Sequence, residues 1–201
     1  MVLKTREKLI EVARQLFAHK GVGNTTMNDI AAASDKGRRT IYTYFKNKRE
    51  IYNAVIERES DQLVSRLRDV ANTNMRPTEK LRLFLCHRFD HIAPLTQRHE
   101  VSLSIFGRDL KRVERIRQLA MSKVFAILDT ILSEGIKAGE FDPEQAKILP
   151  LTLSCMIQGM DYISSKTPLD DTTTLQDTRR NAIEFIINGL KTNNPNKDTS
   201  V

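Results

Sequence analysis

The chain has 201 residues, of which 40% are hydrophobic and 28% are charged. This balance is typical of a globular protein, and it excludes a disordered polymer and a membrane-embedded chain, because no apolar run approaches the ~20 residues that a membrane helix needs. The net charge of +7 lies mostly in the first fifty residues, which contain eleven Lys and Arg but only five Asp and Glu. This concentration of positive charge implies a polyanionic partner, either nucleic acid or an anionic membrane surface.

The first two predicted elements are helices. Apolar residues recur at helical spacing from Leu9 to Phe17, and Gly21 supplies a typical helix end. Thr26 is a good N-cap residue, and Asp29 stands three positions later, where a carboxylate can complete a capping box. We therefore expect a second, short helix to begin after Thr26.

Two further helices follow a polar turn over residues 34–37. In the segment 38–45, Ile41 and Phe45 are four residues apart and are expected to face inward, which leaves the remaining side chains to face outward. Asn47 is followed by Glu50 in a second capping-box pattern, and this predicts a long helix that runs to about residue 73.

The rest of the chain predicts five more helices. Gly139 ends one of them, and Asp142 followed by Pro143 is a typical helix start. The fold class expected is therefore all-α, with about nine helices in total. The five segments are residues 78–91, 100–108, 113–138, 143–165 and 175–190.

The N-terminus and the cysteines indicate where the protein resides. The first residues lead into a charged periodic helix and not into an apolar segment, so no secretory signal is expected. Cys86 and Cys155 are too few for a disulfide scaffold, and both lie in apolar helical runs where a reduced, buried thiol is the default. We therefore expect a cytoplasmic protein.

The two short helices and their turn have the arrangement of a helix-turn-helix. In that motif the second helix enters the major groove and presents its N-terminal side chains to base edges. Arg38, Arg39 and Thr40 stand at this position. The arginine fork matches the acceptors of guanine, and threonine can contact a thymine methyl group, so these three residues are the candidates for base contacts.

Three more residues are candidates for phosphate contacts. Tyr42 and Tyr44 offer hydroxyl groups, and Lys48 opens a helix whose free amides and positive dipole end favour an anion. The alternative is that residues 36–39 form a solvated basic turn and that the tyrosines are half-buried packing residues.

A set of residues between positions 6 and 56 has the spacings of a known domain. They are Arg6, Ala13, Leu16, Phe17, Gly21, Thr25, Thr26, Asp29, Ile30, Ala31, Ile41, Tyr42, Tyr44, Phe45, Lys48, Ala54 and Val55. With these residues the region resembles the N-terminal domain of the TetR family of transcriptional regulators. The resemblance implies a three-helix DNA-binding head, a larger all-helical ligand-binding body, and a homodimer that represses transcription until a small molecule enters the body. By position, Thr26, Tyr42 and Lys48 correspond to phosphate-contacting residues of that family.

The turn departs from the family's pattern. Asp35 stands where the family usually has glycine, Lys36 replaces an apolar residue, and Gly37 replaces a Ser or Thr cap. Aspartate tolerates a left-handed backbone and glycine can begin a helix, so the turn is still expected to form. We expect a head over residues 1–50, an effector-binding and dimerisation domain over residues 51–190, and a disordered tail over residues 191–201.

A ligand cavity is expected among the helices that start near residues 78, 113 and 143. Aromatic side chains and adaptable methionines suit an apolar effector, although residues of this kind at helical spacing also form ordinary core. The expected lining is Phe84, His87, Phe89, Phe106, Met121, Phe125, Met156 and Tyr162.

A dimer interface is expected on the last two long helices, as in the TetR family. Their apolar faces are wider than a monomeric helix pair needs, and the alternative is that the same residues fill the core of one chain. The residues are Leu153, Ile157, Met160, Ile183, Ile186, Ile187 and Leu190.

His87 and His91 leave a metal-binding alternative open. They are four residues apart, which is the spacing of paired imidazole ligands, and Cys86 or His99 would have to complete the site. The protein expected is therefore a dimeric DNA-binding regulator, without catalytic residues, metal or cofactor. The alternatives are a helical metal-binding protein or metalloenzyme, and an interaction adaptor that keeps the fold without binding an operator.

Overall fold

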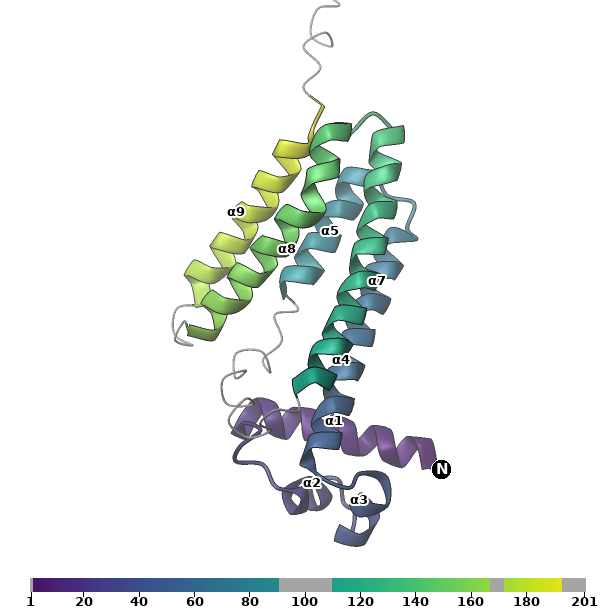
Figure 1. The fold of residues 1–201 in the computed structure, drawn as a ribbon, viewed down its shortest axis with the longest axis vertical. Helices are drawn as coiled ribbons and strands as arrows, with labels where there is room; N and C mark the ends of the chain where they lie inside the picture. Colours follow the sequence, from purple (N-terminus) through teal and green to yellow (C-terminus); the bar gives the residue numbers. More distant parts are fainter. Residues whose placement is uncertain (1, 91–109, 167–171, 193–201) are drawn as a thin grey trace, which may run out of the picture. The chain divides into compact units, whose positions relative to one another are not determined.

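The structure is a computed structural model, and it describes residues 2–90, 110–166 and 172–192 (Figure 1). Within these ranges the protein has eight helices and one isolated bridge between Phe141 and Lys191, so the predicted all-α fold is confirmed. The helix expected over residues 100–108 lies outside the described residues. The helices are α1 (Val2–Lys20), α2 (Met27–Ala33), α3 (Arg38–Tyr44), α4 (Lys48–Ala71), α5 (Pro77–Asp90), α7 (Leu110–Lys137), α8 (Pro143–Lys166) and α9 (Thr172–Leu190).

The described residues form two compact units. The first unit contains α1, α2, α3, α4 as far as Gln62, and α7 as far as Met121; the second contains the remainder of α4 and α7 together with α5, α8 and α9. Two helices, α4 and α7, therefore contribute residues to both units. None of the helices in the described ranges combines the length and apolar character that crossing a bilayer would require.

A continuous apolar core holds the first unit together. Its members come from all five helical segments of the unit, and the rings of Phe17 and Tyr52 meet edge to face with centroids 6.0 Å apart. Burying one such large side chain contributes about 1.5–3 kcal/mol. The core residues are Leu9, Ile10, Ala13, Phe17, Val22, Ile30, Ala31, Ile41, Phe45, Ile51, Tyr52, Ala54, Val55, Ile56 and Val113.

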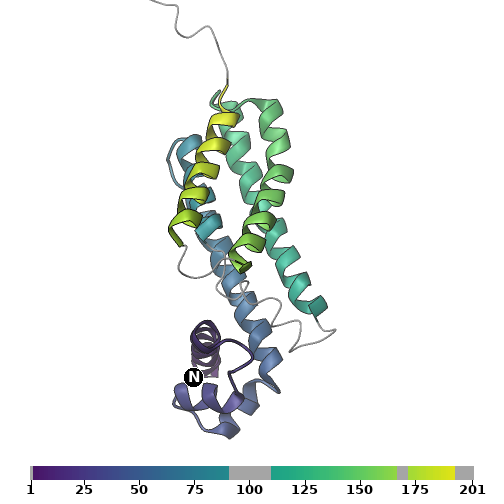
Figure 2. The same cartoon turned by 90° about the vertical axis from the view of Figure 1, so that its left-hand side faces the viewer.

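In the second unit α9 packs against both α5 and α8, and Figures 1 and 2 show α8 and α9 side by side. Polar contacts reinforce the apolar core. Arg82 of α5 forms a bidentate ion pair with Glu184 of α9. The buried ammonium of Lys80 donates to Ala71 O at 2.9 Å and to Glu134 Oε2 at 2.7 Å, which satisfies a charge that would otherwise be costly to bury.

The connection from α7 to α8 has the local features that its sequence predicts. Gly139 has a φ of 70°, and the amide of Glu140 donates to Gly135 O at 2.9 Å, which closes the end of α7. Asp142 Oδ1 accepts from the amides of the second and third residues after it, at 2.9 and 3.0 Å, and so caps α8. The ring of Phe141 lies where a Cβ on Gly135 would be, so this position requires glycine.

Candidate nucleic-acid interface

The turn between α2 and α3 is built by local hydrogen bonds. Asp35 has a φ of 57°, so aspartate does adopt the left-handed backbone in the place where the family usually has glycine. The amide of Lys36 donates to Ala31 O at 2.9 Å, and the buried hydroxyl of Ser34 donates to the same carbonyl at 2.9 Å. Gly37 then begins α3 in an extended conformation, without a side-chain cap.

The capping box of α2 forms as predicted. Thr26 Oγ1 accepts from the amide of Asp29 at 3.1 Å, and Asp29 Oδ2 accepts from the amide of Thr26 at 2.8 Å. Hydrogen bonds from the backbone amide and from the side chain of Thr26 hold the pKa of the Asp29 carboxyl below its usual value. Thr26 is exposed, and its contact with a phosphate stays a prediction.

Helix α3 has the predicted inward and outward faces. Ile41 and Phe45 are buried in the core of the first unit. Arg38 and Arg39 are exposed, and Thr40 is half-buried. The inner face thus fixes the helix to its own unit, while the two guanidinium groups at its N-terminus face solvent, as base-reading side chains must before DNA binds.

The two tyrosines of α3 have different environments. Tyr42 is 43% exposed, and the guanidinium carbon of Arg38 lies 5.8 Å from the centroid of its ring. Tyr44 is half-buried and packs against the core of the first unit. The structure therefore leaves Tyr42 exposed, whereas Tyr44 has the half-buried packing position that the sequence left as an alternative.

Lys48 has structural contacts that the sequence pattern did not indicate. Its ammonium donates to Val22 O at 2.7 Å and to Gly23 O at 3.2 Å, so it ties the start of α4 to the segment between α1 and α2. Burial lowers the pKa of Lys48, and the carboxylate of Asp29 partly offsets this effect. Two of the three ammonium hydrogens are thus engaged within the unit, which leaves one for a phosphate.

The start of α4 is capped almost as predicted. Asn47 Oδ1 accepts from the amide of Glu50 at 3.0 Å. The carboxylate of Glu50 accepts from the amide of Lys46 at 2.8 Å, one residue earlier than a capping box requires. This arrangement places Lys48 in the first turn of α4, next to the loop carbonyls that it contacts.

A charged cluster joins α1 to α4 within the first unit. Arg58 Nη2 of α4 lies 3.3 Å from Oε2 of Glu11. Arg14 donates a hydrogen bond to the other oxygen of this carboxylate, Oε1, at 2.7 Å. Burial raises the pKa of the neighbouring Glu59, although the positive charge of Arg14 opposes the effect. The cluster was not identified from the sequence, because its α1 members and its α4 members are almost fifty residues apart and no local pattern connects the two helices.

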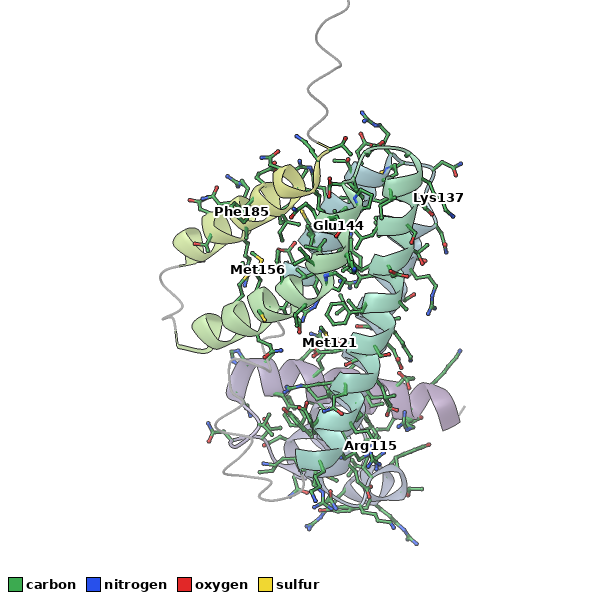
Figure 3. The ribbon with its side chains drawn as sticks, turned by 45° about the horizontal axis from the view of Figure 1, so that its top comes forward. Arg115, Met121, Lys137, Glu144, Met156 and Phe185 are labelled. Carbon is green, nitrogen blue, oxygen red and sulfur yellow. The ribbon has the colours of Figure 1, made fainter. Side chains whose placement is uncertain are left out.

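The residues expected to line an effector cavity occupy several environments. Phe84 and Phe89 are buried in the second unit. Four others are half-buried: His87, Met121, Phe125 and Met156, of which Met121 belongs to the first unit (Met121 and Met156 are labelled in Figure 3). Phe106 and the side chain of Tyr162 lie outside the described residues. The role of all these residues in binding an effector stays a prediction.

The seven residues expected at a dimer interface are buried within the single chain, with 0–7% of their surfaces exposed. This is the arrangement in which they fill the core of one chain, which the sequence left as the alternative. The exposed apolar side chains of the same two helices are different residues. Ile148, Leu151 and Phe185 are 57%, 75% and 79% exposed (Phe185 is labelled in Figure 3). Cys155 is also exposed and Cys86 is half-buried, so the expectation of buried thiols is wrong.

The described residues give no support to a metal site at His87. No group of three or more His, Cys, Asp or Glu side chains in the described ranges is arranged to hold a metal ion. His91 and His99 lie outside those ranges. His87 itself is half-buried near the end of α5.

Comparison with known proteins shows where the resemblance is strongest. Residues 9–55 match the family model of the bacterial regulatory proteins, tetR family. A probable acrEF/envCD operon repressor of Escherichia coli is 51% identical over 51 residues, which is 25% of this chain and 23% of that protein. An uncharacterised HTH-type transcriptional regulator of Bacillus subtilis is 23% identical over 201 residues, which is 96% of this chain and 100% of that protein.

The fold of the whole chain is also found among solved structures. A transcriptional regulator from Cytophaga hutchinsonii superposes with a TM-score of 0.76 at 22% identity, covering 92% of this chain and 98% of the other. The family model therefore covers residues 9–55, and the similarity in fold extends over 92% of the chain. These relatives are transcriptional regulators, a class of proteins that are not enzymes.

Proposed function

We propose that the chain is a regulator of the TetR family, a cytoplasmic, dimeric repressor that leaves its operator when a small molecule binds. The observation that supports operator binding is the outward face of α3. Arg38 and Arg39 are exposed there, on a helix that Ile41 and Phe45 anchor from the other side. Two such helices in a dimer would enter successive major grooves, ~34–36 Å apart, on a pseudo-palindromic site.

Selection of bound duplexes from a random pool tests this proposal. We expect a symmetric motif to be enriched over a scrambled control. Arg38→Ala should lower discrimination at one base pair of each half-site by ~1–3 kcal/mol and leave the other base pairs unaffected. If no sequence is enriched, the chain is not an operator-binding regulator, and the adaptor alternative is favoured.

The dimer is proposed to form through the exposed apolar side chains of α8 and α9. Leu151 and Phe185 would each bury a large apolar surface against a second copy, and the Cβ positions of Gly159 and Gly189 on the same helices are open, which allows close approach. Light scattering after size exclusion tests this. Leu151→Glu should give a monomer, whereas Leu119→Glu, at an exposed apolar residue of α7, should leave the dimer intact.

The effector is proposed to be largely apolar and to bind in the second unit. Phe125 of α7 and Met156 of α8 are half-buried, so each of these two helices offers apolar surface that is not fully enclosed. An effector can act only through different affinities for the operator-bound and operator-free forms. We propose that α4 and α7 transmit the effect of the effector to the first unit, because each of these helices contributes residues to both units.

A further inference from the structure

We propose that Tyr42 is a positioning residue for base reading, and that its ring orients the guanidinium of Arg38 before DNA binds. This inference rests on the proposed function of α3 in operator recognition. The guanidinium carbon of Arg38 lies 5.8 Å from the centroid of the Tyr42 ring. That distance is within the ~6 Å at which the face of an aromatic ring attracts a cation.

The pair forms because of its register on a well-anchored helix. Arg38 is the first residue of α3 and Tyr42 follows one turn later, so the two side chains share one face. Ile41, which precedes Tyr42 in the chain, is buried in the core of the first unit and anchors the helix. The backbones that carry the arginine and the ring are therefore held in a fixed relation to each other.

Stacking on the ring affects base reading through entropy. A long arginine side chain loses rotamer freedom when it makes a two-point contact with a base. If the ring has already restricted the side chain in the free protein, less freedom is lost on binding. Since base contacts carry sequence information and phosphate contacts do not, this contribution is to discrimination at the base pair that Arg38 contacts.

The ring and the hydroxyl of Tyr42 can be tested separately. Tyr42→Phe keeps the ring and removes the hydroxyl, so affinity should fall by the same factor for every duplex. Tyr42→Leu also removes the ring, and discrimination at one base pair of each half-site should then fall by a further factor of about two to five. Because Tyr42 is an exposed side chain, neither variant should unfold the protein, and circular dichroism checks this.

The experiment measures dissociation constants at one salt concentration for the selected operator and for duplexes with each half-site position changed singly. The proteins are the wild type, both Tyr42 variants, Arg38→Ala, and the double variant Arg38→Ala with Tyr42→Leu. In the double variant the loss of the ring should change no base preference beyond that caused by Arg38→Ala, since the ring acts through the arginine.

Three outcomes overturn the positioning role. The first is that Tyr42→Leu keeps the base preference of the wild type, and the second is that it lowers affinity for all duplexes by the same factor as Tyr42→Phe. The third is measured without DNA, as the NMR order parameter of the Arg38 Nε–Hε group. This order parameter should be lower in Tyr42→Leu than in the wild type and unchanged in Tyr42→Phe, and equal values in all three proteins contradict the proposal. A wild type that selects no duplex overturns the proposed function, and the positioning role with it.

Discussion

The contacts of Lys48, for which we propose a phosphate contact, predict that this residue also stabilises the first unit. The substitution Lys48→Met keeps most of the aliphatic side chain and removes the ammonium. The carbonyls of Val22 and Gly23, which accept from it at 2.7 and 3.2 Å, then lose a charged donor. Affinity for DNA should fall for all sequences alike, because phosphate contacts do not depend on sequence.

The size of the stability change follows from the nature of these bonds. A hydrogen bond from a charged group contributes about 1.5–3 kcal/mol net, and the second contact here is long and exposed, so we expect a total loss of about 1.5–3 kcal/mol. For a protein of this length 1 kcal/mol corresponds to a change in Tm of about 2–4 °C. The expected decrease in Tm is therefore about 3–12 °C.

Thermal unfolding of the protein without DNA measures this effect, with Lys46→Met as the matched control. Lys46 is two residues away and its side chain is exposed, so its removal takes away the same charge but none of the carbonyl contacts. The control should lie within about 0.5 kcal/mol of the wild type. If Lys48→Met weakens DNA binding while its Tm equals that of the control, the two carbonyl contacts contribute nothing and the argument is refuted.

Three further predictions concern the caps and the second unit. Thr26→Ala should cost about 1 kcal/mol, measured by urea unfolding, because it removes the capping acceptor of α2; an unchanged midpoint would contradict this. Gly135→Ala should destabilise by about 1–3 kcal/mol through overlap with a buried ring, and a Tm equal to that of the wild type would contradict the close packing. Burial raises the pKa of Glu140, but the hydrogen bonds from Thr78 and Arg76, together with the charge of Arg76, outweigh this and lower the pKa from its usual 4.5. Stability should therefore be full above pH 4.5 and fall as the pH drops through the lower folded value, a step that Glu140→Gln should abolish.

The sequence predicted the helices well because their signals are local. A cap such as Thr26 or Asp142 acts on amides two or three residues away, and the structure shows these hydrogen bonds where the pattern placed them. The inward and outward faces of α3 were also predictable, since Ile41 and Phe45 share one side of a short helix.

Partners distant in the chain were not predictable in the same way. Lys48 contacts carbonyls about 25 residues earlier, and no periodicity relates these positions. The different environments of Tyr42 and Tyr44 depend on which side of α3 meets the core, and the hydroxyl groups alone do not indicate it. The apolar faces of α8 and α9 showed that something must cover them, but not whether another helix of the same chain or a second copy does so.

By itself, then, the sequence determined the all-α fold, the capped starts of α2, α4 and α8, and the N-terminal helix-turn-helix with its outward arginines, since each depends on residues within one or two turns of one another. The starts of α7 and α9, at Leu110 and Thr172, lie three residues earlier than the predicted 113 and 175. Only the tertiary structure decided that the seven candidate interface residues lie in the core of one chain, that Lys48 is a tie between segments, and that Arg38 stacks on a tyrosine ring. The physical reason is that an apolar or charged side chain specifies the kind of partner it needs, whereas the packing of helices decides which partner is within reach.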